Sequence, residues 1–160
     1  MRTIIASGAL IAAALALPAC VMVKSDDVTW HSSPDVEHYK GVTIEGMNLP
    51  FSKAVRVDDT IYLSGDIGID PATNAIVPGG VGPETAQIFA NMTRTLSQFD
   101  AGLGDIVKCT VFLDDMAHYG EMNAAYDAAL PDPKPARSTV AVKGLAVGAG
   151  TEIECIAVKR

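Results

Sequence analysis

The segment from Ile106 to Leu113, IVKCTVFL, carries apolar side chains at both odd and even positions. Successive side chains of a β-strand point to opposite faces of the sheet, so this pattern predicts a strand that is covered on both sides. The rest of the chain must therefore supply neighbouring strands and something to cover each of the two faces.

Strand-like and helix-like segments alternate along the rest of the chain. We expect strands in VTIEGM, KAVRVDD, TIYLSGDIGI, IVKCTVFL, RSTVAV and TEIECIAV. We expect one helix from Pro83 through the repeat Phe89, Met92, Leu96 and Phe99, and a second from His118 to Leu130, which Pro131 ends. The order β-β-β-α-β-α-β-β predicts an α+β domain with a single sheet and two helices packed on one face. Because two helices cover only one face, the other face favours a homo-oligomer.

Length and charge limit the class of protein. The 160 residues suit a single domain, and the formal net charge is −7 without any run rich in Lys or Arg. Nucleic-acid binding depends strongly on basic side chains that neutralise phosphates, so we expect no nucleic-acid partner. The three histidines, His31, His38 and His118, do not have the spacing of a zinc motif, and we expect no metal site.

The first twenty residues, MRTIIASGALIAAALALPAC, have the pattern of a secretory leader. Arg2 supplies the positive charge, and the apolar run from Ile4 to Leu17 is short for a membrane span. The end of the leader, Leu17 to Cys20, is similar to a bacterial lipobox, in which the chain is cut before a cysteine that then receives lipid. The alternative is ordinary cleavage after Ala19, which would leave a secreted protein without lipid.

These features predict three parts of the chain. Residues 1–19 form a signal peptide, residues 20–40 a tether, and residues 41–160 the folded domain. We expect an extracytoplasmic, periplasmic protein that is anchored only by lipid on Cys20. Val21 follows the cysteine in place of the aspartate typical of lipoproteins retained in the inner membrane, which favours the outer membrane.

Two further cysteines, Cys109 and Cys155, lie in the apolar strand segments IVKCTVFL and EIECIAV. An oxidising compartment permits a disulfide between them. The sequence does not show that their Cα atoms approach each other, and we expect buried free thiols.

Six segments together resemble the reactive intermediate deaminase (Rid, or YjgF-like) family over residues 48–160. They are NLPFSKAV, IYLSGDIGIDP, DIVKCTVFLDDM, MNAAYDAAL, KPARSTVAV and TEIECIAV. The resemblance implies a chorismate-mutase-like α+β fold and a homotrimer with sites in the clefts between subunits. It also implies hydrolysis of 2-imino acids, or their enamine tautomers, to 2-keto acids and ammonia without a cofactor.

Two charged residues are the expected catalytic residues. An arginine that begins a strand, as Arg137 does, is often only a solvated edge residue. The resemblance instead implies that Arg137 holds the substrate carboxylate through paired charge-assisted hydrogen bonds. Glu152 resembles the acidic residue of the family and would activate water and return a proton to the departing nitrogen. Glu154, on the same face of its strand, is the second choice.

Other positions match the substrate-binding residues of the family: Phe51, Gly65, Asn123 and Thr139. Thr139 lies two residues after Arg137 and so shares its strand face. The chain departs from the pattern twice, because Phe51 stands where many members have tyrosine and Asp66 stands where glutamine is common. A carboxylate at position 66 in the cleft would repel an anionic substrate.

Two other functions fit part of this pattern. One is a module without catalytic activity that binds a small carboxylate in the same cleft between subunits. The other is a ribonuclease or translation inhibitor, an activity ascribed to some relatives, which both the acidic charge and the leader oppose.

Overall fold

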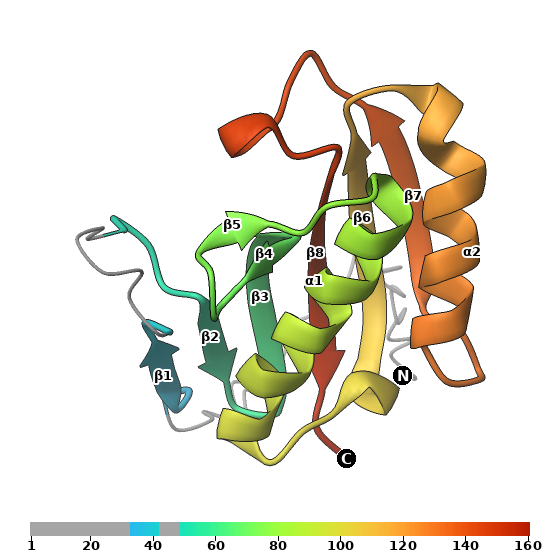
Figure 1. The fold of residues 1–160 in the computed structure, drawn as a ribbon. Coiled ribbons are helices and arrows are strands. Elements are labelled where there is room, and N and C mark those ends of the chain that lie inside the picture. Colours follow the sequence, from blue (N-terminus) through green and yellow to red (C-terminus); the bar gives the residue numbers. More distant parts are fainter. Residues whose placement is uncertain (1–32, 42–48) are drawn as a thin grey trace, which may run out of the picture. The chain divides into compact units, whose positions relative to one another are not determined.

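The computed structural model describes residues 33–41 and 49–160, and Figure 1 shows their arrangement. A six-stranded sheet is accompanied by a two-stranded hairpin and two α-helices. The strands are β1 (Val36–Tyr39), β2 (Ala54–Val57), β3 (Thr60–Ile67), β4 (Ile69–Asp70), β5 (Ala75–Ile76), β6 (Ile106–Leu113), β7 (Ala136–Ala141) and β8 (Thr151–Val158). The helices are α1 (Val81–Leu96) and α2 (Tyr119–Ala129), and short 3-10 helices span Ser97–Phe99, Leu103–Asp105, Met116–His118 and Ala146–Gly148.

The strand order of the main sheet is β1-β2-β3-β8-β6-β7. β6 and β7 pair in parallel through the crossover helix α2, whereas the other neighbouring strands pair antiparallel. β6 lies in the interior of the sheet, between β8 and β7. Both helices lie on one face of the sheet (Figure 1), which confirms the predicted α+β architecture.

The core lies between α1 and the covered face of the sheet. The predicted helical repeat is confirmed, because Phe89, Met92, Leu96 and Phe99 are all at most 5% exposed. Burying side chains of this size stabilises the fold by about 1.5–3 kcal/mol each. The α2 residue Tyr126 meets Phe89 edge to face at a centroid distance of 5.3 Å, and this contact joins the two helices.

The start of α1 differs slightly from the expectation. The helix begins at Val81, so Pro83 lies in the first turn but not at the first helical position. Gly79 and Gly80 precede it with φ values of 111° and 91°, a backbone conformation that glycine adopts without strain. This glycine pair lets the chain enter the helix two residues earlier than the proline indicated.

The face of the sheet away from the helices remains partly open in a single chain. Its large apolar side chains include Tyr62 on β3, 49% exposed, and Val140 on β7, 45% exposed. A hollow of about 360 Å³ on this face is lined by Tyr62, Lys108, Glu154 and neighbouring residues. The exposed apolar groups agree with the expectation that another copy of the chain covers this face.

The expectation of free thiols is wrong. Cys109 on β6 and Cys155 on β8 are direct cross-strand partners and form a disulfide, with their Cα atoms 4.1 Å apart. Both residues are at most 2% exposed within the core. Their sequence separation of 46 residues did not indicate the pairing, because only the order of the strands brings β8 beside β6.

Removal of this disulfide should lower the stability of the domain. A bond that closes a loop of 46 residues stabilises the folded state by about 4 kcal/mol in the chain-entropy model. We expect Cys109→Ala/Cys155→Ala to lose about 2–4 kcal/mol of unfolding free energy in urea titrations. Reduced wild-type protein is the control and should be destabilised similarly. A double variant as stable as the oxidised wild type would contradict the prediction.

The predicted signal peptide, the lipidation site Cys20 and most of the tether lie outside the described residues, as does the strand predicted in VTIEGM. Residues 36–39, which we expected in the tether, form β1 and pair with β2, so the folded domain begins before residue 41.

Within residues 33–41 and 49–160, no helix has the length and apolar character needed to span a membrane.

Candidate functional site

Arg137 on β7 lies beneath α2, which holds its guanidinium in place. Its Nη2 donates hydrogen bonds to the hydroxyl of Tyr119 at 2.9 Å and to Oδ1 of Asn123 at 2.8 Å. Its Cζ also lies 4.6 Å from the ring centroid of Tyr126 and 5.6 Å from that of Tyr119. With Thr139, these residues form a group that we call the arginine cluster.

The local sequence explains this grouping. Tyr119 and Asn123 are four residues apart on α2 and therefore lie on one face of the helix. Arg137 and Thr139 are two residues apart on β7 and share a strand face. The hydroxyl of Thr139 is buried and has no hydrogen-bond partner within the described residues, so it is free to bind a ligand that reaches the cluster.

A second group lies around Glu152, at the start of β8. A cavity of about 490 Å³ is lined by Glu152, Phe51, Gly65, Asp66 and Lys53, together with other residues. Phe51 is 45% exposed, and its ring offers an apolar surface to a ligand. We call these five residues the glutamate pocket.

Gly65 makes room for the carboxylate of Glu152. A Cβ atom at position 65 would lie 2.0 Å from Oε1 of Glu152, so a side chain there would displace the carboxylate from its present place. The family resemblance implied that Gly65 contacts the substrate. In the structure its lack of a side chain already serves the neighbouring glutamate.

Asp66 lines the glutamate pocket but is largely buried. A register shift in β3 between Leu63 and Asp66 turns both residues toward the covered face, and Asp66 is 5% exposed. Its Oδ1 pairs with Nζ of Lys53 at 2.8 Å. The ammonium group compensates the negative charge, so the expected repulsion of an anionic substrate is weakened.

Burial and neighbouring charges alter the acidity of the pocket. Burial raises the pKa of Glu152 above its ordinary value, the charges of Glu154 and Asp66 raise it further, and Lys53 lowers it. Burial also raises the pKa of Asp66, against the opposing effect of Lys53. Glu152 therefore retains its proton to higher pH than an exposed glutamate, which suits a group that must both accept and donate protons.

The arginine cluster and Glu152 point to opposite faces of the sheet. Arg137 pairs with Cys109, and Cys109 pairs with Cys155, so these three side chains share the face covered by helices. Glu152 precedes Cys155 by three residues in an unbroken register and therefore points to the other face. Among the described residues, Arg137 is not part of the lining of the glutamate pocket.

The structure thus divides the predicted site residues into two groups. Arg137, Asn123 and Thr139 lie in the arginine cluster, whereas Glu152, Gly65 and Phe51 lie in the glutamate pocket. The second choice, Glu154, lines the hollow on the open face and not this pocket. Sequence reasoning missed Tyr119 as a site residue, although its spacing of four from Asn123 was visible.

Known proteins share this fold and much of the sequence. The family described as Endoribonuclease L-PSP matches residues 45–159. The mouse protein named 2-iminobutanoate/2-iminopropanoate deaminase is 41% identical over 110 residues, which cover 69% of this chain and 82% of that protein.

Solved structures agree with the predicted fold. RidA from an Antarctic Psychrobacter bacterium superposes with a TM-score of 0.67 at 30% identity, covering 80% of this chain and 99% of that one. The YjgF gene product of E. coli gives a TM-score of 0.64 at 34% identity, covering 69% and 89%. The expected YjgF-like fold is therefore confirmed.

Proposed function

Because the chain belongs to the endoribonuclease L-PSP family, which includes the Rid and YjgF proteins, we propose that it is an imine deaminase. It would hydrolyse 2-imino acids, or their enamine tautomers, to 2-keto acids and ammonia. The observation that carries this proposal is the state of Arg137. Among the described residues, both of its side-chain hydrogen bonds use Nη2, so Nε and Nη1 retain donors for a substrate carboxylate.

The proposed reaction needs only water and two protein groups. Arg137 binds the carboxylate and so fixes the adjacent C=N carbon. Glu152 accepts a proton from a water molecule as its oxygen adds to this carbon and passes that proton to the nitrogen, which gives a tetrahedral carbinolamine. Glu152 then takes the proton of the new hydroxyl and delivers it to the amino group, the C–N bond breaks, and the products are ammonia and the 2-keto acid.

The separation of Arg137 and Glu152 supports a site made by two copies of the chain. The two side chains point to opposite faces of one sheet and cannot both contact a small imino acid in one chain. We propose that the arginine cluster of one copy faces the glutamate pocket of the next, within a homotrimer closed by repeated heterologous contacts. The exposed Tyr62 and Val140 on the open face support the same assembly.

Direct measurement of imine lifetime tests the proposed activity. An amino acid oxidase generates 2-imino acids in situ, and semicarbazide traps the imine that remains. We expect the domain without its leader to reduce the trapped product for several side chains. Equal trapping with and without protein would refute the deaminase. Retained ligand binding in that case would support the alternative of a small-carboxylate-binding module.

Asp66 provides a test of how Glu152 titrates. Its negative charge raises the pKa of Glu152, so Asp66→Asn should lower that pKa. The limb of the kcat–pH profile that reports Glu152 should then move to lower pH, whether Glu152 acts as acid or base. Asp59→Asn is the control, because Asp59 lies exposed in the turn between β2 and β3. A profile unchanged by Asp66→Asn, or shifted upward, would contradict this prediction.

We also propose that the protein works outside the cytoplasm, anchored by lipid on Cys20 in the outer membrane. The lipobox-like leader supports this location, and the Cys109–Cys155 disulfide suits an oxidising compartment. Labelled palmitate should enter the full-length chain in a Gram-negative host but not its Cys20→Ser variant. Unlabelled protein in the cytosol with reduced thiols would refute the proposal.

A further inference from the structure

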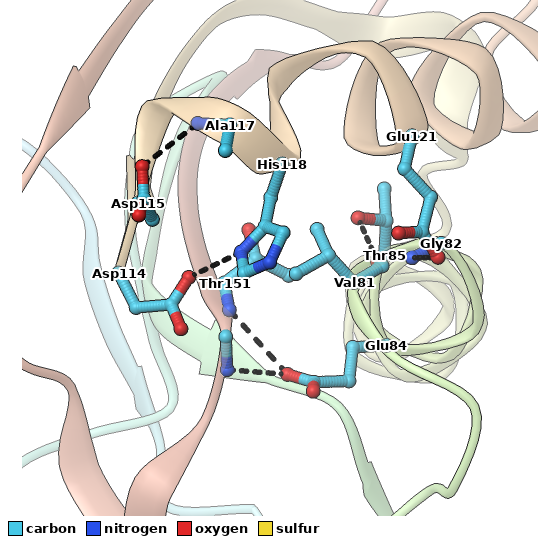
Figure 2. A network of polar contacts seen from close by, with 11 residues as sticks. Val81, Gly82, Glu84, Thr85, Asp114, Asp115, Ala117, His118, Glu121 and Thr151 are labelled. Carbon is cyan, nitrogen blue, oxygen red and sulfur yellow. Dashed lines mark hydrogen bonds and ion pairs between the residues drawn. The ribbon is translucent and has the colours of Figure 1, made fainter.

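Glu84 is a buried carboxylate in the first turn of α1 that binds the backbone of β8 (Figure 2). It is 6% exposed. Its Oε2 accepts hydrogen bonds from the backbone N–H of Gly150 at 2.9 Å and of Thr151 at 3.4 Å. These two residues directly precede Glu152, so the contact fixes the backbone from which the catalytic carboxylate extends.

Glu84 also packs against the strand end on the other side of Glu152. A Cβ atom at Gly68 would lie 2.7 Å from Cα of Glu84, so the β3–β4 backbone passes directly against this residue. Gly68 is three residues beyond Gly65, which itself abuts the carboxylate of Glu152. One residue of α1 therefore contacts the two residues that precede Glu152 and the chain just after Ile67, the β3 partner of Glu152.

We propose that Glu84 is a positioning residue for Glu152 and sets the place of its carboxylate by holding the Gly150–Thr151 backbone. The inference rests on the proposed function, because it assumes that Glu152 acts on water. Displacement of a catalytic group by about 1 Å can reduce turnover by about a hundredfold. A buried anion that binds the two preceding N–H groups limits such displacement.

Glu121 is a natural control for this role. It is also an acidic residue in the first turn of a helix, and its Oε1 accepts the N–H of Gly82 at 2.9 Å. It is exposed, and it contacts the start of α1 rather than β8 (Figure 2). Glu121→Ala removes a similar hydrogen bond, also at the start of α1, and should leave kcat unchanged.

Two substitutions test whether the length of the Glu84 side chain or its charge is what positions Glu152. Glu84→Gln keeps the length of the side chain and an acceptor oxygen, and we expect its kcat to stay within about threefold of wild type. Glu84→Asp keeps the charge but is one methylene shorter, and we expect kcat to fall about tenfold or more with little change in KM. Wild-type kcat in Glu84→Asp would overturn the inference. So would a folded Glu84→Gln variant without activity.

A double-mutant cycle tests whether Glu84 acts through Glu152. If it does, adding Glu84→Asp to Glu152→Gln should not lower the residual turnover further. A further loss equal to that seen in the wild-type background would show a general structural role and overturn the inference. Wild-type kcat in Glu152→Gln alone would refute the proposed role of Glu152 and this inference together. A strong loss in Glu152→Gln with none in Glu84→Asp would refute only the inference.

Discussion

Arg137→Ala is expected to reduce kcat/KM for 2-imino acids by about 10²–10³-fold, because it removes the charged donors that bind the carboxylate. Most of the loss should appear as a higher KM, since the carboxylate is bound in the ground state as well as in the transition state. The semicarbazide assay at several substrate concentrations separates the two constants.

Two other variants define what Arg137 contributes. Arg137→Lys keeps a positive charge but lacks the planar guanidinium that can bond Tyr119 and Asn123 and still present donors to a carboxylate, so it should recover only part of the loss. Arg56→Ala is the matched control, because Arg56 on β2 pairs with Asp35, just before β1, and with Glu37 on β1. An Arg137→Ala variant with wild-type KM and kcat would show that another group binds the carboxylate.

The elements of the fold were predictable because their patterns are local. The apolar residues of α1 recur at helical spacing, and the interior strand β6 carries apolar residues on both faces. Family resemblance assigned both Arg137 and Asn123 to the site, and the structure shows their hydrogen bond. No pattern in the sequence states that β7 passes beneath α2.

The remaining features depend on long-range structure. The register shift in β3 turns Asp66 inward, whereas strict alternation from Leu63 would have turned it outward. The Cys109–Cys155 disulfide depends on the placement of β8 beside β6. The opposite orientations of Arg137 and Glu152 likewise follow from the register of β7, β6 and β8. No local sequence pattern indicates that register.

Coexpression of two impaired variants should restore activity if each site is built from two copies of the chain. Arg137→Ala has an intact glutamate pocket, and Glu152→Gln has an intact arginine cluster. When both are coexpressed in equal amounts, random assembly of a ring brings an intact Arg137 and an intact Glu152 together in about a quarter of the sites. At substrate concentrations well below the wild-type KM, we therefore expect the mixture to reach about a quarter of the wild-type rate per site, while Arg137→Ala alone stays about 10²–10³-fold lower and Glu152→Gln alone keeps only a small residual rate.

A second mixture controls for the amount of functional chain. Wild type coexpressed with the double variant Arg137→Ala/Glu152→Gln should retain about a quarter of the activity if sites form between copies, but about half if they form within one chain. Affinity tags on the two chains confirm that mixed oligomers are present. If mixed oligomers of the single variants stay inactive and the second mixture retains half, both residues act within one chain. The register that turns Arg137 and Glu152 to opposite faces favours the first outcome, because a single copy has no way to bring both groups to one small substrate.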